Sequence, residues 1–316
     1  MTTVTAAGLR GPNAAAGLRG PNAAAGLRGP NAASEAAHKA AVLAEALPYI
    51  RRFWGKVVVV KYGGSAMDDP ALAASFAQDV VLMRSVGMRP VVVHGGGPQI
   101  GALMARLGMV PEFRDGLRVT DADTLDVARM VLVGKVNRDI VSSVNVLGPL
   151  AVGLSGEDAG LIMATARKPE LGFVGDVVQV NPSIIERLMA EELIPVIATI
   201  GSDAEGQAYN INADVAAAAI AEAVAAEKLV YLTDVAGLLA DLGDPSSLVH
   251  SLTVDELDAW LAGGKVSGGM IPKLASCARA VRGGVGHAHI LDGRVPHALL
   301  LEVFTNEGIG TMIGPS

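Results

Sequence analysis

Two lysines stand beside glycine-rich turns in this sequence, and their setting is suited to binding an anion. Lys61 ends an apolar run and precedes Gly63 and Gly64, while Lys273 follows the turn 268–272. Glycine has no Cβ, so backbone N–H groups in such a turn can approach a ligand closely. An isolated lysine is more often a solvated surface charge, so the hypothesis of an anion site depends on the residues around these two.

A second glycine cluster, Gly95–Gly97, follows another apolar run, and Asp214 begins an alanine-rich stretch. Open α/β sheets bind ligands at the carboxyl ends of their strands, where both glycine clusters are predicted to lie. Neither cluster matches the GxGxxG pattern of dinucleotide-binding folds, and the P-loop pattern is absent from the chain. An aspartate able to pair with both lysines makes a phosphate site a more specific prediction than glycine turns alone.

Strands and helices alternate along the chain and would position these residues. Buried strands are predicted at 57–62, 90–94, 194–200 and 229–233, with a polar-edged hairpin at 161–167 and 173–180. Helices are predicted after Asp69-Pro70 and Gly97-Pro98, over 121–146 and over 214–226, with a loop at 115–120. This alternation predicts an α/β fold, a three-layer αβα sandwich around a largely parallel sheet.

The N-terminal region differs from the rest of the chain. Residues 5–31 hold three nearly identical nonapeptides, and the Gly and Pro of each copy forbid a continuous helix. We expect residues 1–34 to be a disordered repeat tail. Residues 35–55 are predicted to form a helix, kinked at Pro48, with one apolar stripe made of Leu43, Leu47, Ile50 and Trp54. That stripe must be buried, against its own subunit or against another.

Composition argues against several classes of protein. The 316 residues are enough for two domains, and a net charge of −7 lacks the basic footprint of a nucleic-acid-binding protein. Cys277 is the only cysteine, and its helical setting predicts a buried structural thiol. The histidines form no zinc-binding pattern, and no apolar run reaches the roughly 18 residues of a membrane span. We therefore expect a cytoplasmic protein that binds neither membrane nor nucleic acid and has no dedicated metal site.

Seven motifs follow one another from Lys-Tyr-Gly-Gly-Ser-Ala-Met to Gly-Gly-Met-Ile-Pro-Lys. They lie at 61–67, 94–100, 116–120, 153–160, 209–214, 232–238 and 268–273. In this order they resemble N-acetylglutamate kinase, of the amino-acid kinase superfamily, from about residue 36 to the C-terminus. The Lys-x-Gly-Gly start is shared with carbamate, aspartate and uridylate kinases. The motifs Gly-Leu-Arg-Val-Thr and Asn-Ile-Asn-Ala-Asp separate this family from them.

The resemblance implies transfer of the γ-phosphoryl group of ATP to the side-chain carboxylate of N-acetyl-L-glutamate, a step of arginine biosynthesis. That carboxylate is already a nucleophile, so the main obstacle is repulsion between two anions. By resemblance, Lys61 and Lys273 neutralise the transferring group, and Asp214 orients both lysines. The N–H groups expected to hold the phosphate oxygens belong to Gly63, Gly64, Gly95 and Gly96. Magnesium is expected to arrive with the ATP phosphates.

Two lobes are also implied, with N-acetylglutamate bound by residues 56–226 and ATP by residues 227–316. Arginine suits the non-reacting carboxylate because its planar guanidinium can donate two parallel hydrogen bonds. The implied substrate-binding residues are Gly96, Gly97, Arg118 and Asn210. The implied nucleotide-binding residues are Asp234, Gly237, Leu238, Lys265 and Ser267.

Two further stretches, 47–56 and 289–302, resemble those family members that arginine inhibits. In such members the N-terminal helices interlace dimers into a homohexamer, a trimer of dimers, which would bury the apolar stripe. Arginine is expected beside that helix, near Tyr49, His289, Glu302 and Gly308. A PII-type nitrogen regulator is a further candidate partner.

Two alternatives of different kinds stay open. A related kinase acting on another small acid would be recognised by ADP release with glutamate, aspartate or carbamate in place of N-acetylglutamate. A non-catalytic sensor would use the pocket only to bind arginine, and it would have no need to keep both Lys61 and Lys273.

Overall fold

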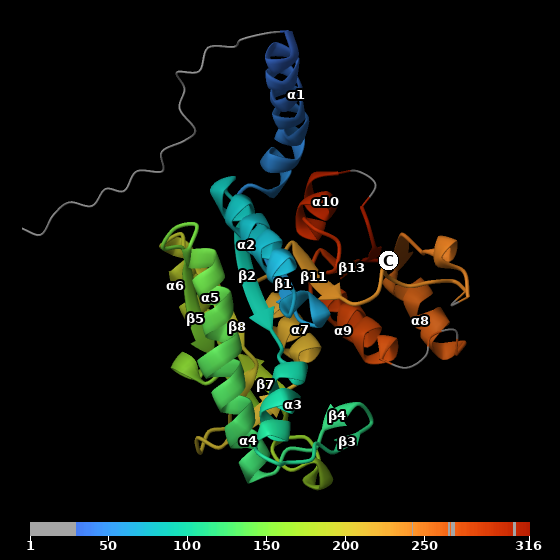
Figure 1. Cartoon of the computed structure of the whole chain (residues 1–316). Coiled ribbons are helices and arrows are strands. Elements are labelled where there is room, and N and C mark those ends of the chain that lie inside the picture. The colour runs from blue at the N-terminus through green and yellow to red at the C-terminus, as the bar shows by residue number, and fades with distance from the viewer. Residues whose placement is uncertain (1–29, 242, 265, 267–268, 306–307) are drawn as a thin grey trace, which may run out of the picture. The chain divides into compact units, whose positions relative to one another are not determined.

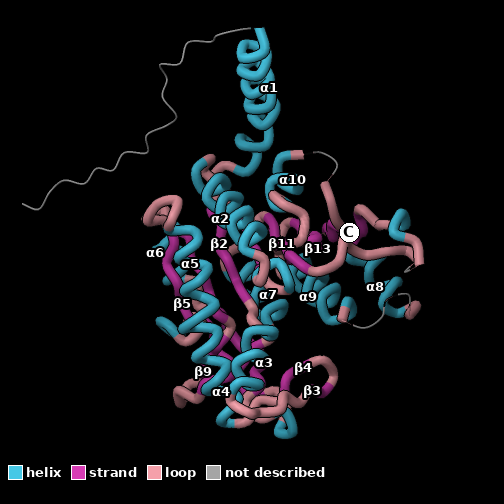
Figure 2. The backbone as a smooth tube through the Cα atoms, viewed as in Figure 1, coloured by secondary structure: helices cyan, strands magenta, loops and turns pink. Residues whose placement is uncertain are grey.

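The computed structural model describes residues 30–316 apart from 242, 265, 267–268 and 306–307, and it divides after Leu47 into two units. In the unit Pro48–Ser316, the main sheet has the strand order β12-β14-β13-β11-β1-β2-β8-β5. Figure 1 labels its strands from β13 to β5, and Figure 2 shows the same sheet among its helices. Neighbouring strands are parallel except β13 and β14. The strands are β1 (Val57–Tyr62), β2 (Arg89–His94), β5 (Ala151–Ser155), β8 (Ile194–Ala198), β11 (Lys228–Thr233), β12 (Ser251–Thr253), β13 (His287–Asp292) and β14 (Thr311–Gly314).

Alternate residues of this sheet face two separate cores, which is why its strands read as unbroken apolar runs. Along β1, Val59 belongs to one core and Val58 and Val60 to the other, and all three are fully buried. The first core is covered by α6 (Ser183–Ala190), α7 (Ala213–Ala223), α8 (Val254–Ala262) and α9 (Met270–Arg282). The second is covered by α2 (Pro70–Ser85), α3 (Gly97–Arg106), α4 (Ala122–Arg129), α5 (Asn137–Asn145) and α10 (Ala298–Phe304). The predicted α/β fold with a largely parallel sheet between helices is confirmed.

The elements that carry the glycine turns begin and end close to their predicted residues. Strand β1 has the predicted bounds, and β2 starts one residue early, at Arg89. Helix α2 is capped by Asp69, whose carboxylate accepts the N–H of Ala71 at 2.7 Å, with proline at the first helical position. The strand predicted over 194–200 is wrong as a single element, because β8 ends at Ala198 and the chain then leaves the main sheet.

A small second sheet holds the strand that follows. It consists of β6 (Ile162–Ala166), β7 (Val174–Val180), β9 (Ile200–Ser202) and β10 (Ala208–Ile211). Strands β6 and β7 pair antiparallel, which confirms the predicted hairpin. The loop predicted at 115–120 is partly wrong, because β3 (Phe113–Arg114) and β4 (Leu117–Arg118) form a hairpin there. Its turn residues Asp115 and Gly116 have φ of 50° and 77°, the left-handed conformation that an Asp-Gly hairpin turn favours.

The helix predicted over 121–146 is present but not uniform. A π-helical segment, η2 (Met130–Val136), separates α4 from α5. Such segments widen a helix by one residue per turn and are frequent at functional sites. Side chains of η2 pack on the glycine loop after β2, because a Cβ built on Gly96 would lie 2.6 Å from Leu132 Cδ2.

Helix α1 (Pro30–Phe53) spans the boundary between the two units and continues through Pro48. Residues 1–29 of the predicted tail lie outside the described residues, whereas residues 30–34, also predicted as tail, form the start of α1. The predicted stripe is wrong at its end, where Trp54 lies beyond the helix and is 67% exposed, while Phe53 is buried at 2%. Leu43 is also largely exposed, at 72%, among the residues that the structure describes.

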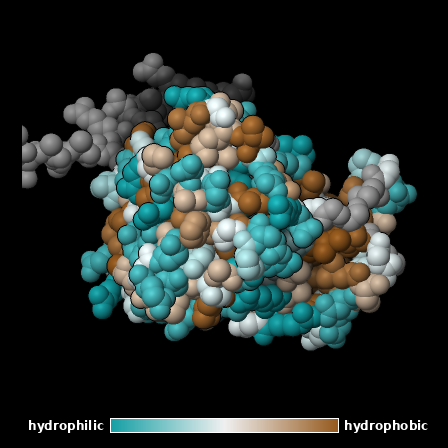
Figure 3. Space-filling model, turned by 90° about the horizontal axis from the view of Figure 1, so that it is seen from below, coloured by the Kyte–Doolittle hydropathy of each residue, from teal (hydrophilic) through white to brown (hydrophobic). Residues whose placement is uncertain are grey.

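The surface and the single thiol are those of an ordinary globular fold. In the part of the chain that the structure describes, no helix is long and apolar enough to span a membrane. On the face shown in Figure 3, hydrophilic residues alternate with small hydrophobic patches, as is normal for protein surfaces. Cys277 is fully buried in α9, and burial raises the pKa of its thiol far above the ordinary value, as expected of an inert structural cysteine.

Candidate active site

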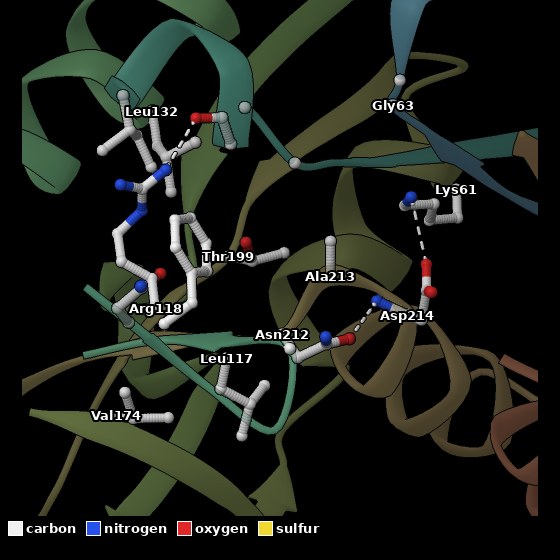
Figure 4. Close-up of a pocket in the computed structure, with 18 residues that line it drawn as sticks. Lys61, Gly63, Leu117, Arg118, Leu132, Val174, Thr199, Asn212, Ala213 and Asp214 are labelled. Carbon is white, nitrogen blue, oxygen red and sulfur yellow. Dashed lines mark hydrogen bonds and ion pairs between the residues drawn. The ribbon is translucent and has the colours of Figure 1, made fainter. Parts of the chain in front are cut away.

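Asp214 lies directly between the two lysines that the sequence singles out. Lys61 stands near the carboxyl end of β1, and its Nζ is 3.0 Å from Asp214 Oδ1 (Figure 4). Lys273 belongs to the first turn of α9, and its Nζ is 2.7 Å from Asp214 Oδ2. Asn212 caps α7 by accepting the N–H of Asp214 at 2.9 Å, which fixes the aspartate in the first turn of that helix.

The charge balance of this triad suits a phosphoryl group. The side chains of Lys61, Lys273 and Asp214 are 13%, 15% and 15% exposed. Burial alone would raise the pKa of Asp214, but the nearby ammonium groups of Lys61 and Lys273 outweigh burial and lower it. Two ammonium groups around one carboxylate leave a local charge of about +1, and this excess is available to an anion that enters between the lysines.

A first cavity, of about 250 Å³, is lined by two members of the triad, Lys61 and Asp214 (Figure 4). Its wall contains Lys61, Asp214 and all four glycines predicted to hold phosphate, Gly63, Gly64, Gly95 and Gly96. Gly97, Arg118 and Asn210 also line it, so the structure brings the predicted substrate-binding residues to the same space.

Arg118 is oriented by three contacts around that cavity. Its Nη2 donates to the carbonyl of Gly97 at 2.9 Å, and its guanidinium carbon lies 4.8 Å from the ring centre of Phe113. Its Nη1 lies 3.3 Å from Met104 Sδ. Burial lowers the pKa of Arg118, which is a cost that an anionic ligand would offset. Asn210, in β10, donates from Nδ2 to Thr120 Oγ1 at 3.3 Å.

A second cavity has a volume of about 480 Å³. It is lined by Lys61, Gly64, Asp234, Gly237, Leu238 and Lys273, with Val266 and Met270 adding apolar surface. Lys265 and Ser267, the two other predicted nucleotide positions, lie outside the described residues. Lys61 and Gly64 line both cavities, so ligands in the two spaces would meet at the ammonium of Lys61.

Gly64 is the position where the two cavities join, and its backbone requires glycine. Its φ is +79°, and a Cβ there would lie 2.5 Å from Asp234 Oδ1. Gly237, whose φ is +152°, is similarly confined, with Thr311 Oγ1 at 2.6 Å from a built Cβ. These close approaches explain why positions 64 and 237 are both glycine.

Several residues around the first cavity were not anticipated from the sequence: Ile100, Phe113, Leu117, Leu132, Val174, Thr199 and Asn212. Asn212 could have been found, because Asn two residues before a helical aspartate is a common cap. Phe113 and Leu117 enter through the unpredicted hairpin β3–β4. Leu132 and Val174 come from distant segments whose approach no local pattern reveals.

A third cavity, of about 380 Å³, contains three of the four residues predicted to bind arginine, Tyr49, Glu302 and Gly308. His289 does not line it; the imidazole is 1% exposed and its Nδ1 is 2.7 Å from Glu302 Oε1. Lys228 approaches the same carboxylate oxygen at 3.5 Å. Burial lowers the pKa of His289, so at neutral pH the imidazole beside Glu302 is mostly uncharged.

No dedicated metal site is found in the described residues, where no three His, Cys, Asp or Glu side chains gather. In the second cavity, the carboxylate of Asp234 stands beside Gly64. This donor set fits a magnesium ion that is held mainly by phosphate oxygens and water.

The chain matches the amino acid kinase family over residues 56–292. An acetylglutamate kinase of Symbiobacterium thermophilum is 56% identical over 288 residues, which cover 88% of this chain and 98% of that relative. An acetylglutamate kinase of Saccharopolyspora erythraea is 56% identical over 290 residues, 90% of this chain and 95% of the relative.

Among solved structures, N-acetylglutamate synthase from Neisseria gonorrhoeae complexed with coenzyme A and N-acetyl-glutamate has a TM-score of 0.77 at 26% identity. The match covers 88% of this chain and 63% of that chain. The same synthase complexed with coenzyme A and L-arginine has a TM-score of 0.73, covering 88% of this chain and 65% of that one. By its sequence and its fold, this chain belongs to the amino acid kinase family and, within it, to the acetylglutamate kinases.

Proposed function

We propose that this chain transfers the γ-phosphoryl group of ATP to the side-chain carboxylate of N-acetyl-L-glutamate, giving N-acetylglutamyl 5-phosphate for arginine biosynthesis. The observation that carries the proposal is the triad at the junction of two cavities, where Lys61 and Lys273 both contact Asp214. The family membership of the chain supports the same reaction.

The chemistry follows from charge. The attacking carboxylate needs no general base, so the protein must mainly hold two anions together and stabilise the transferring group. Lys61, which lines both cavities, and Lys273 on the nucleotide side would neutralise that group. Asp214 keeps the two ammonium groups apart and correctly aimed, because each binds a different oxygen of its carboxylate.

N-acetylglutamate would occupy the first cavity, in the lobe 56–226. Arg118 would bind its non-reacting carboxylate with guanidinium N–H groups, and Asn210 would contribute an amide beside it. ATP would occupy the second cavity, in the lobe 227–316, with Asp234, Gly237 and Leu238 along its wall. Bound magnesium would supply charge neutralisation at the phosphates.

A test of the function is hydroxamate trapping of the acyl phosphate formed from N-acetylglutamate and ATP. We expect the parent chain to give the hydroxamate and Lys273→Ala to lose at least about 10³-fold in turnover while still binding ATP, because one of two phosphoryl-stabilising charges is gone. Equal turnover with glutamate, aspartate or carbamate would instead support a related kinase. Absence of turnover in a chain that binds arginine would support a sensor.

Regulation by arginine is a second part of the proposal. The third cavity pairs the carboxylate of Glu302 with Tyr49 and Gly308, a setting suited to a guanidinium or an α-ammonium group.

A homohexamer in which α1 interlaces dimers would bury the exposed stripe at Leu43, and a PII-type regulator is a further candidate partner. A cytoplasmic enzyme is expected. Deleting residues 1–53 should yield dimers that arginine does not inhibit, which sizing and inhibition assays would check.

A further inference from the structure

His94 is fully buried directly before the glycine loop of the first cavity, and it has no role in the mechanism above. Its Nδ1 lies 2.9 Å from the carbonyl oxygen of Gly95. Its Nε2 lies 3.1 Å from Nδ2 of Asn137, the first residue of α5 after the π-helical segment. Both ring nitrogens therefore have one partner each, on opposite sides of the imidazole.

The partners determine the tautomer of this ring. The carbonyl of Gly95 can only accept, so Nδ1 must carry the hydrogen. Nδ2 of Asn137 also lies 2.8 Å from the carbonyl oxygen of Val196, which identifies it as the amide nitrogen. It therefore donates to Nε2 of His94, and Oδ1 of Asn137 accepts from Arg138. Burial lowers the pKa of His94 to about 4, so the imidazole is neutral at physiological pH.

The hydrogen bond from His94 orients a peptide that borders the cavity. The carbonyl of Gly95 and the N–H of Gly96 belong to one peptide group, which is trans like the other described peptides. In a trans peptide these two groups point in opposite directions. Since the carbonyl is directed at a buried imidazole, the N–H of Gly96 is directed away from it, and Gly96 lines the first cavity.

Close packing fixes both Gly96 and Asn137, the residues at the two ends of the hydrogen-bonded chain through His94. Leu132 and Val136 of η2 press on Gly96, where a Cβ would lie 2.6 Å and 3.3 Å from their methyl carbons. On the other side, Gly153 of β5 lies so close to Asn137 that a Cβ would overlap its Oδ1. Glycine at 153, which opens one of the seven motifs, thus makes room for the amide that holds His94.

We propose that His94 is a positioning residue, which Asn137 holds in the Nδ1–H form so that the Gly95–Gly96 peptide presents its N–H to the transferring phosphoryl group. This inference rests on the proposed kinase function. The peptide without its imidazole partner could rotate about the flexible glycine torsions and withdraw a donor from the transition state. The expected defect is therefore in kcat more than in substrate binding.

Three variants distinguish a loss of positioning from a loss of protein stability. His94→Leu should lower kcat about 100-fold, the loss typical of one missing oxyanion donor, with KM for ATP and N-acetylglutamate within about threefold. His94→Asn should recover at least about tenfold of that loss, because its amide nitrogen can stand where Nδ1 stood. Val92→Ala, a fully buried residue on the same strand, is the control for destabilisation and should keep kcat near the parent value at 25 °C.

A second measurement does not depend on turnover. In ¹⁵N spectra of the parent chain, the His94 imidazole signals can be assigned because they are missing from the spectrum of His94→Asn. These signals should show a protonated Nδ1 and an unprotonated Nε2 between pH 6 and pH 8. Asn137→Leu should abolish that pattern and lower kcat with it. The proposal is overturned if His94→Leu keeps kcat within threefold, if its loss merely follows the thermal stability shared with Val92→Ala, or if the ring is the Nε2–H tautomer. An inactive parent chain would overturn the kinase function, while the spectra still test the hydrogen bonds.

Discussion

Two largely buried carboxylates of this chain each lie between two basic side chains, yet they are suited to different tasks. Asp214 contacts Lys61 at 3.0 Å and Lys273 at 2.7 Å. Glu302 contacts His289 at 2.7 Å and Lys228 at 3.5 Å. We call them the Asp214 cluster and the Glu302 cluster.

The clusters differ in net charge. In the Asp214 cluster two ammonium groups face one carboxylate, so about one positive charge is left over. In the Glu302 cluster burial lowers the pKa of His289, and one ammonium therefore faces one carboxylate. Of the two clusters, only the Asp214 cluster has an excess positive charge that can attract an anion. The Glu302 cluster is electrically balanced, and its carboxylate faces a cavity where a cationic ligand could replace one of its basic partners.

They also lie at opposite ends of strands. Lys61 is near the carboxyl end of β1, where parallel sheets bind ligands, whereas Lys228 is the first residue of β11. The comparison teaches that a buried ion cluster is not by itself an active site. Its place in the sheet and its excess charge decide what it can do.

The largest expected effect comes from removing one ammonium in each cluster. Lys61→Met should lower kcat by at least about 10³-fold, because a phosphoryl-stabilising charge is lost. Lys228→Met should leave kcat within about threefold but lower the free energy of unfolding by about 3 kcal/mol, since Glu302 stays buried with one partner fewer. Hydroxamate assays and urea unfolding measure the two quantities. Equal losses of turnover in both variants would remove the distinction between the clusters.

The next effect concerns the carboxylate of the Glu302 cluster. Glu302→Gln should raise the arginine concentration for half-inhibition by roughly 10- to 100-fold, because a hydrogen bond to a charged group is worth about 1.5–3 kcal/mol. Uninhibited kcat should stay near the parent value. Arginine titrations of the steady-state rate provide the measurement, and an unchanged half-inhibition value would contradict the assignment of this cavity.

A smaller effect tests the junction of the two cavities. Gly64→Ala should lower kcat about tenfold, because a Cβ would lie 2.5 Å from Asp234 Oδ1 and a positive φ would add strain of roughly 1–2 kcal/mol. Gly206→Ala is the matched control, since its φ of +85° brings the same strain with no atom within 4 Å of a Cβ. Similar kinetics in the two variants would show that space at Gly64 has no part in turnover.

The smallest effect is a difference in pH dependence. Burial lowers the pKa of His289 from its ordinary 6.5, so below pH 6.5 the unfolded chain binds more protons than the folded one and stability is lost as pH falls. Asp214, whose pKa is lowered from 3.8 by the two lysines against the effect of burial, contributes stability that is lost only below about pH 3.8. His289→Gln should therefore flatten the stability profile in the range just below pH 6.5, by at most about 1.4 kcal/mol per pH unit. Chemical unfolding across that range is the measurement, and an unchanged slope would contradict the burial argument.

Local patterns were enough to predict most elements of the sheet. Val57–Tyr62 is a strand because its β-branched residues are buried on both faces, and α2 begins where Asp69 and Pro70 supply a cap and a fixed φ. The hairpin at Asp115 and Gly116 was missed although Asp-Gly is a strong turn signal. The division of η2 from its neighbours could not be anticipated, because the segment reads as an ordinary helix.

By itself, the sequence determined which residue types could carry the chemistry, since ammonium groups beside glycine turns and an acidic first helical turn are written in local order. Only the tertiary structure decided which of them meet. Lys61, Asp214 and Lys273 are separated by more than fifty residues in each step. They converge because the carboxyl end of β1 lies beside the first turns of the helices α7 and α9. The hydrogen bond from Asn137 to His94 likewise joins the first residue of α5 to the last residue of β2, two segments that only the fold brings together.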